Sequence, residues 1–112
     1  MYVHDHAAGV EAALLCGRRG EVYNLAPASA SEAVTADIIE QVRSLVGKGQ
    51  IERVQDRDNY DLRYWMDASK AAESLNWKAR FDLHQTVNST VAWYLSNTSW
   101  LEAATNKLVS GG

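Results

Sequence analysis

The sequence predicts a small, helix-rich α/β lobe that is closer to an α+β arrangement than to any all-β design. Apolar residues recur at helical spacing over most of the chain, and the few strand-like segments are separated by these helices. A chain of 112 residues with 46% hydrophobic and 22% charged residues is typical of one soluble domain. No repeat or low-complexity linker marks a boundary, so we expect residues 1–112 to form a single lobe.

The first helix is expected over residues 6–16, with Asp5 as its N-cap. Ala7, Val10 and Leu14 would fall on one face of this helix. The residues expected to flank this face are Ala8, Ala12 and Leu15. The glycines that follow, at positions 17 and 20, are expected to end the helix.

Three more helices are expected over residues 35–46, 68–75 and 84–96, and a final turn or short helix is expected over residues 100–108. The helices at 35–46 and 84–96 have apolar residues at helical spacing. Gly47 would end the second helix of the chain and Asp67 would cap the third. The inner face of the fourth helix would carry Val87, Val91, Tyr94 and Leu95.

Three short strands are expected between these helices. They span residues 21–25, 51–54 and 63–66, and a polar loop from Gln55 to Leu62 leads into the last one.

The bulk composition excludes several classes of protein. A net charge of −3 with interspersed signs disfavours a broad nucleic-acid surface, and no apolar run approaches the roughly 20 residues of a membrane span. The N-terminus does not resemble a secretion signal. The single cysteine, Cys16, is expected to be a buried thiol in a reducing, cytoplasmic compartment.

The loop around Arg57 is the candidate binding site. Arg57 and Arg63, six residues apart, lie among acids and aromatic residues. A guanidinium suits bidentate contact with phosphate oxygens, although neighbouring acids also fit an exposed ion pair. Tyr60 and Tyr64 could stack on a base or sugar, or lie in a core. Asn24 could reach a ligand oxygen or simply form a turn.

No catalytic residue and no metal site is predicted. The glycines do not form the dinucleotide-binding spacing, no tyrosine stands four residues before a lysine, and no hydrolase triad is apparent. The His4-Asp5-His6 triplet lacks further metal ligands at suitable spacing, and helix capping by Asp5 accounts for it.

Several segments together resemble the C-terminal part of the nucleotide-sugar 4,6-dehydratases, which are extended short-chain dehydrogenases/reductases. The dTDP-glucose 4,6-dehydratase type is the most similar, with the UDP-glucose type nearly as close. The matching motifs occur in the family's order over nearly the whole chain. They are residues 2–7, 21–24, 56–57, 61–64, 67–70, 75–78 and 93–97.

The resemblance implies a substrate-binding lobe that lacks the NAD-binding Rossmann domain. By resemblance, Arg57 would bind the diphosphate of dTDP- or UDP-glucose, Asn24 would contact the nucleotide-sugar, and Tyr60 would take the place of a nucleotide-binding histidine. Asp58 and Asn59 stand where family members usually have proline and glycine. NAD would be bound elsewhere in the full-length family, so the chain alone is expected to be inactive.

An alternative expectation is a non-catalytic interaction module. Its uncovered apolar surface would bind a second copy or a Rossmann-domain partner.

Overall fold

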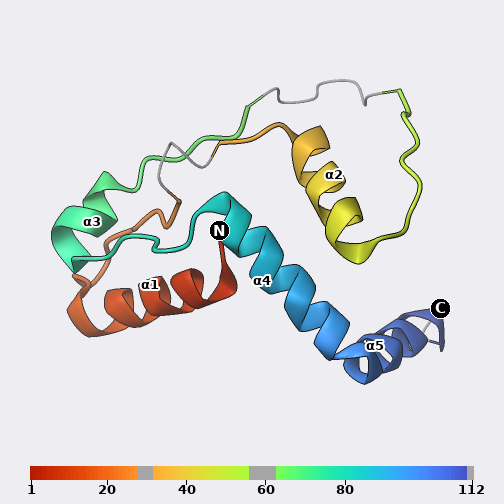
Figure 1. Cartoon of the computed structure of the whole chain (residues 1–112). Coiled ribbons are helices and arrows are strands. Elements are labelled where there is room, and N and C mark those ends of the chain that lie inside the picture. The colour runs from red at the N-terminus through yellow and green to blue at the C-terminus, as the bar shows by residue number, and fades with distance from the viewer. Residues whose placement is uncertain (28–31, 56–62, 111–112) are drawn as a thin grey trace. The chain divides into compact units, whose positions relative to one another are not determined.

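The computed structural model describes residues 1–27, 32–55 and 63–110, and the regular structure in these ranges is helical (Figure 1). The helices are α1 (Val3–Cys16), α2 (Thr35–Val46), α3 (Ser69–Leu75), α4 (Leu83–Ser96) and α5 (Thr98–Ser110). The four expected helices are therefore confirmed, and the expected final turn or short helix is a helix. The observed bounds of α1 to α4 differ from the expected ones most at the start of α1, which begins three residues earlier than expected. The last helix, α5, is longer than expected at both ends.

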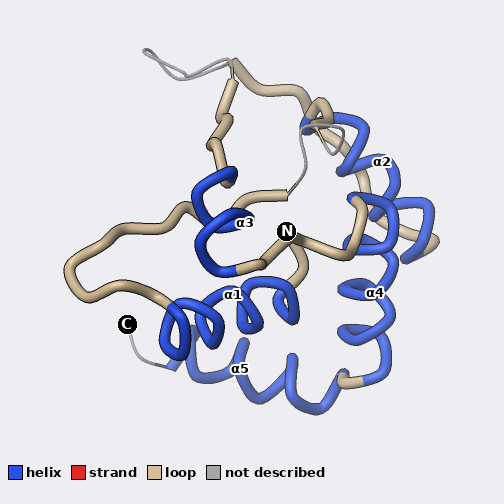
Figure 2. The backbone as a smooth tube through the Cα atoms, turned by 90° about the vertical axis from the view of Figure 1, so that its left-hand side faces the viewer, coloured by secondary structure: helices blue, strands red, loops and turns tan. Residues whose placement is uncertain are grey.

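The three expected strands are wrong, because residues 21–25, 51–54 and 63–66 run as extended chain without strand pairing (Figure 2). An extended segment becomes a strand only when a neighbouring backbone takes up its N–H and C=O groups. In residues 21–25 a side chain takes up one of these groups instead, because Lys70 Nζ donates to Val22 O at 2.8 Å. The side chain of Asn24 donates to Asp67 O at 3.3 Å and so also ties this segment to the chain before α3. The α/β expectation is thus corrected to a helix-rich fold in the described part of the chain.

The chain divides into two compact units. The first comprises Met1–Glu32 with Gln50–Leu83, and the second comprises Ala33–Gly49 with His84–Gly112. The first unit contains α1 and α3, and the second contains α2, α5 and nearly all of α4. That both units form one lobe stays a prediction.

The core of the first unit forms where α1 packs against α3 (Figure 1). Its buried residues are Ala71, Leu75 and Trp77. The face of α1 that meets them consists of small residues, with Gly9 buried and Ala8, Ala12 and Ala13 packed on the cluster. Small side chains allow the two helices and the indole to approach closely.

The apolar face of α1 named from the sequence is not the face that packs on α3. Val10 and Leu14 on that face are 51% and 83% exposed, and Leu15 beside it is 73% exposed. The helix carries small or apolar residues on several sides, so apolar spacing alone does not say which side packs. The space left by Gly9 decides the orientation instead, because a Cβ there would lie 2.6 Å from Leu25 Cδ1 and 3.0 Å from Trp77 Cε2.

Two further expectations for α1 are corrected. Asp5 does not cap the helix, which begins after Tyr2 without a side-chain cap, and Asp5 is instead buried inside its first turns. Cys16, the last residue of α1, is an exposed free thiol rather than a buried one, and it is not among the residues packed on the core. Gly17 ends the helix as expected, with its N–H bonded to Ala13 O at 2.9 Å.

The ends of α2 and α3 follow local rules. Gly47 closes α2 in the left-handed conformation (φ 73°), and its N–H donates to Arg43 O. Asp67 accepts a hydrogen bond from Ser69 N at 2.9 Å, one residue ahead of the Ala68 N-cap position. Asp67 therefore bonds a free N–H at the start of α3, but its expected N-cap position is wrong, because Ala68 is the N-cap and the helix begins one residue later than expected.

In the second unit, α4 buries Val87 and Val91, as expected. Tyr94 and Leu95 were expected on the same inner face, but they are 43% and 54% exposed. Tyr94 instead joins a cluster of rings with Trp93 and Trp100, whose centroids lie 5.2–6.3 Å apart. Aromatic packing at the junction of α4 and α5 thus replaces burial.

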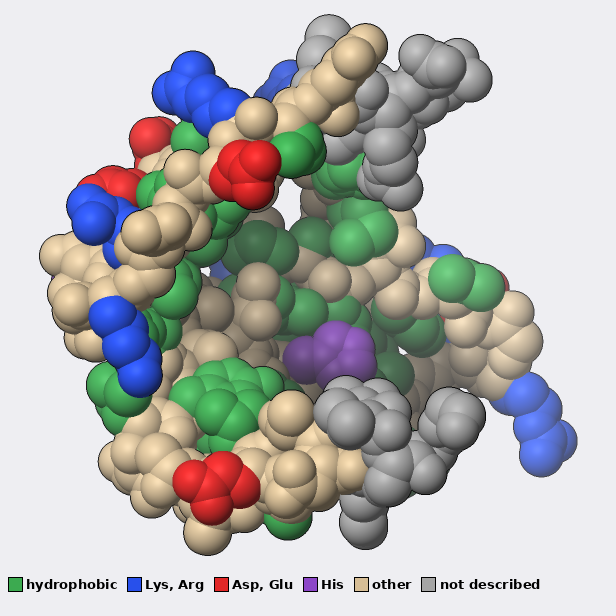
Figure 3. Space-filling model, turned by 90° about the vertical axis from the view of Figure 1, so that its right-hand side faces the viewer, with side chains coloured by type: hydrophobic (Ala, Val, Ile, Leu, Met, Phe, Trp, Pro, Cys, Tyr) green, Lys and Arg blue, Asp and Glu red, His purple; other side chains and the backbone are tan. Residues whose placement is uncertain are grey.

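Apolar side chains also reach the surface, as the green areas of Figure 3 show. Among the residues that the structure describes, no helix is both long and apolar enough to cross a membrane.

The tight contact at Gly9 predicts a destabilising substitution. Gly9→Val should lower the free energy of unfolding by about 1–3 kcal/mol, because its branched side chain must displace Leu25 and Trp77. Ala7→Val is the matched control at an exposed position of the same helix and should change stability by less than about 1 kcal/mol. Urea unfolding followed by circular dichroism measures both. Equal losses in the two variants would contradict the packing described for α1.

Candidate functional site

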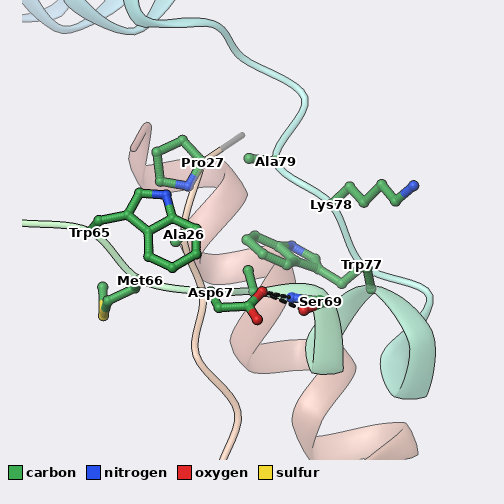
Figure 4. Close-up of a pocket in the computed structure, with 11 residues that line it drawn as sticks. Ala26, Pro27, Trp65, Met66, Asp67, Ser69, Trp77, Lys78 and Ala79 are labelled. Atoms are coloured by element: carbon green, nitrogen blue, oxygen red, sulfur yellow. Dashed lines mark hydrogen bonds between the residues drawn. The ribbon is translucent and has the colours of Figure 1, made fainter. Parts of the chain in front are cut away.

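The candidate site is a pocket of about 380 Å³ in the first unit (Figure 4). Its lining residues come from three segments that are distant in sequence. They are Ala26 and Pro27, then Trp65 to Ser69 with Ala72, and then Trp77 to Ala79. The indoles of Trp65 and Trp77 lie on different sides of the pocket, while the Lys78 side chain extends away from it (Figure 4).

The turn before α3 supplies the polar edge of the pocket. Asp67 Oδ1 accepts hydrogen bonds from the backbone N–H and the hydroxyl of Ser69 (Figure 4). These bonds stabilise the ionised carboxylate, so they lower the pKa of Asp67, with the hydroxyl of Ser69 contributing most. Asp67 therefore offers a negatively charged acceptor beside two indoles.

The turn after α3 places Trp77. Asn76 takes the left-handed conformation (φ 51°) that ends the helix, and its own N–H closes the turn on Ala71 O. The indole of Trp77 is then buried, with 6% of its surface exposed, and its Nε1 donates to Asp5 O at 3.1 Å. The Trp77 side of the pocket is thus buried and hydrogen-bonded, whereas Trp65 on the other side is 57% exposed.

The segment that ends in Ala26 and Pro27 is held by a lysine of α3. Lys70 Nζ lies 2.7 Å from Glu21 Oε2, donates to Val22 O, and sits 5.0 Å from the centre of the Tyr23 ring. The hydrogen bond from Lys70 lowers the pKa of Glu21, with the charge of Lys70 adding to the effect. These contacts anchor the segment that continues through Asn24 to Ala26 and Pro27 at the pocket.

The predicted site residues are placed only in part. Asn24 lies at the edge of the pocket, where its side-chain amide donates to Asp67 O at 3.3 Å. Since an amide has two N–H donors and an oxygen acceptor, this bond uses one of its groups. Arg57 and Tyr60, with Asp58 and Asn59, lie outside the described residues, so their roles stay predictions.

The other candidates of the same stretch have ordinary surroundings. Arg63 forms an exposed ion pair with Glu32, at 2.6 Å between Nη2 and Oε1. Tyr64 is 77% exposed, so it does not belong to a core. The pair of indoles at positions 65 and 77 was not singled out as a site from the sequence. A tryptophan just before a helix-capping aspartate and another just after the same helix is the signal that points to it.

The described residues offer no obvious metal or NAD site. They contain no group of three or more His, Cys, Asp or Glu side chains that could hold a metal ion. They also contain no strand leading through a glycine-rich turn into a helix, which is the unit that holds a dinucleotide. The described residues therefore do not supply that dinucleotide-binding unit.

Comparison with known proteins identifies relatives of the chain, although no protein-family model matches it. A dTDP-glucose 4,6-dehydratase of Xanthomonas campestris pv. campestris is 33% identical over 113 aligned residues, which cover 91% of this chain and 32% of that protein. The enzyme of the same name from Actinoplanes sp. is 37% identical over 102 residues, 89% of this chain and 31% of that protein.

A solved structure agrees with these relatives. The crystal structure of dTDP-glucose 4,6-dehydratase from Bacillus anthracis, in complex with NAD, superposes with a TM-score of 0.75. It is 33% identical to this chain, and the match covers 89% of this chain and 32% of that one.

The chain is thus related to the nucleotide-sugar 4,6-dehydratases, as its motifs predict. Within that class, the relatives it matches are dTDP-glucose 4,6-dehydratases. The chain spans about a third of the length of these curated relatives.

The bond between Ser69 and Asp67 predicts a pH effect. Because the pKa of Asp67 is lowered in the folded chain, this interaction stabilises the fold above the ordinary pKa of 3.8 and is lost as the pH falls through the lowered value. Ser69→Ala should raise the pKa of Asp67 toward its ordinary value. Ser74→Ala, elsewhere on α3, is the control. Carboxyl-carbon NMR titration measures the pKa, and an unchanged value in Ser69→Ala would contradict the assignment.

Proposed function

We propose that this chain is the nucleotide-sugar-binding C-terminal lobe of an NAD-dependent 4,6-dehydratase. Its ligand is dTDP-glucose or UDP-glucose, and it serves the formation of deoxysugar nucleotides. The observation that carries the proposal is the two-indole pocket beside Asn24, in a chain related to dTDP-glucose 4,6-dehydratases.

The charge of the pocket supports separate binding places for the charged and the uncharged part of the ligand. Asp67 lines the pocket with a negative charge, and the Lys78 side chain turns away from it (Figure 4). A diphosphate would therefore be repelled there. An uncharged ring suits the mostly apolar walls better, because it can lie against Trp65 and Trp77 while a donor group meets the Asp67 carboxylate.

The diphosphate is assigned to Arg57, on the loop that precedes the Trp65 segment. An arginine there would form charge-assisted hydrogen bonds with phosphate oxygens. Tyr60 would add a ring contact, and Asn24 would use its remaining amide group on the nucleotide-sugar. In this proposal the chain binds and orients the ligand, and it does not turn the ligand over by itself.

The proposed cofactor, NAD, belongs to a Rossmann domain and not to these residues. When bound there, it supplies the hydride chemistry of the dehydratase reaction. The 112 residues contain neither a dinucleotide-binding glycine motif nor a tyrosine four residues before a lysine. The proposed contribution of this chain is therefore ligand affinity alone.

Binding of dTDP-glucose tests the proposal. Isothermal titration calorimetry of the chain should detect binding at about millimolar ligand, and Arg57→Ala should weaken it by about tenfold or more, because hydrogen bonds to charged groups contribute about 1.5–3 kcal/mol. Arg53→Ala, an exposed arginine four residues earlier, is the matched control and should bind as the unmodified chain does.

A second arm of the same titration examines the pocket. Trp65→Ala should also weaken binding, while Trp100→Ala, which removes a similarly exposed indole outside the pocket, should not. Absence of binding at millimolar dTDP-glucose and UDP-glucose would overturn the proposed function. Binding that is indifferent to both Arg57→Ala and Trp65→Ala would overturn the site.

The exposed apolar face of α1 favours a second candidate function, that of an interaction module. Val10, Leu14 and Leu15 are more than half exposed, and Val22 is 76% exposed. Apolar side chains gathered in this way mark surfaces that bind protein. The occupant would be a second copy or a Rossmann-domain chain.

Sedimentation velocity separates this candidate from a solitary lobe. If the face self-associates, the chain should form dimers at micromolar concentration, and Leu14→Glu should return it to a monomer because a buried carboxylate opposes association. Leu101→Glu, at an exposed leucine of α5, is the control. A monomer at all concentrations, with no binding to a Rossmann-domain chain, would remove this candidate.

A further inference from the structure

One residue of α1 holds both ends of a pocket wall. The wall consists of Trp77, Lys78 and Ala79. At its first residue, the indole Nε1 of Trp77 donates to Asp5 O at 3.1 Å. Just past its last residue, the backbone N–H groups of Arg80 and Phe81 both donate to Asp5 Oδ2 at 3.0 Å.

Asp5 is almost inaccessible to solvent, so its carboxylate interacts with protein groups rather than with water. Only 1% of its surface is exposed, and Oδ1 has no hydrogen-bond partner among the described residues. The nearest cationic atom, Arg80 Nε, is 3.9 Å from Oδ1 and belongs to a side chain that is 76% exposed. A buried carboxylate is costly unless it is hydrogen-bonded. Asp5 is therefore poorly explained as a surface ion pair and well explained as an acceptor for two amides.

The neighbouring turn of α1 completes the support. Gly9 lies one helical turn after Asp5 on the same face, and a Cβ at Gly9 would stand 3.0 Å from Trp77 Cε2. The indole thus rests on the bare backbone at Gly9 while its N–H is held by the carbonyl of Asp5. Position and rotation of the Trp77 ring are both set by α1.

We propose that Asp5 is a positioning residue for ligand binding. Asp5 does not line the pocket, so it acts through the wall at residues 77–79, which its hydrogen bonds hold at both ends. A wall held in advance binds ligand with less loss of conformational freedom than one that must be ordered on binding. This inference rests on the proposed function, in which the pocket receives the uncharged part of the nucleotide-sugar.

Two substitutions of Asp5 test the inference. Asp5→Ala removes the acceptor of both amides and should weaken dTDP-glucose binding by about tenfold or more. Asp5→Asn keeps one oxygen that can accept both bonds, so its affinity should stay within about threefold of the unmodified chain. Val87→Ala is the control for general destabilisation, because Val87 is a buried residue of α4 that does not line the pocket. Its affinity should be unchanged.

Amide hydrogen exchange provides a readout that does not need the ligand. In Asp5→Ala, the amides of Arg80 and Phe81 should exchange about tenfold faster or more, while those within α4 keep their protection. Unmodified affinity in a folded Asp5→Ala, or a loss of affinity of about tenfold in a folded Asp5→Asn, would overturn the inference. If Asp5→Ala does not fold, Asp5→Asn alone decides.

The two proposals fail in different ways. If the unmodified chain binds no dTDP-glucose or UDP-glucose, the proposed function fails. Exchange at Arg80 and Phe81 then still decides whether Asp5 holds the wall: protection that is unchanged in Asp5→Ala would overturn that role as well.

Discussion

The first unit depends on the burial of one indole against a helix that offers almost no side chain at that point. Trp77 is 6% exposed, lies on α1 at Gly9, and donates its N–H to the carbonyl of Asp5. Close packing gives the apolar gain, and the hydrogen bond removes the cost of burying a polar donor. The contact joins residues 72 positions apart, so it fixes how the two ends of this unit meet.

From this contact follows the pocket. The turn after α3 places Trp77, Lys78 and Ala79 in one wall of the pocket. The segment before α3 places Trp65 and Asp67 in another part of the pocket. A short helix between two turns is thus enough to gather aromatic and acidic groups from both of its ends. Lys70, on the same helix, secures the segment that bears Asn24. Most of the residues that line the pocket therefore lie on α3, lie next to it in sequence, or belong to a segment that is hydrogen-bonded to it.

Local rules predict the helices of this chain well, and long-range contacts explain where the predictions are wrong. The bounds of α2 follow from Thr35, Val46 and the left-handed Gly47, all of which act locally. From the sequence, an aspartate at position 5 looks like a helix cap. Its hydrogen-bond partners are instead the backbone amides of Arg80 and Phe81, far along the chain. Nothing within one turn of Asp5 reveals them. The packed face of α1 is set from a distance in the same way, because Trp77 and Leu25 lie against Gly9.

For the strands and the site as well, local patterns are visible in the sequence and long-range contacts are not. Residues 21–25 have strand propensity, but pairing needs a partner backbone, and Lys70 and Asp67 contact this segment instead. The side-chain amide of Asn24 bonds to Asp67, a residue that lines the pocket, while its proposed contact with a ligand stays a prediction. The two indoles that flank the pocket are not recognised, because their proximity depends on the fold around α3. Motif resemblance identified the relatives because it draws on the order of many short segments together.

The exposed thiol at the end of α1 has a practical consequence for any measurement of association. Cys16 is the single cysteine of the chain and is open to solvent, beside the exposed Leu15. Without a reductant, two chains can become covalently joined through a disulfide and then resemble a specific dimer. The same accessibility makes Cys16 a natural attachment point for one fluorophore or spin label. A probe at this position would report from the very end of the helix on which the first unit is built.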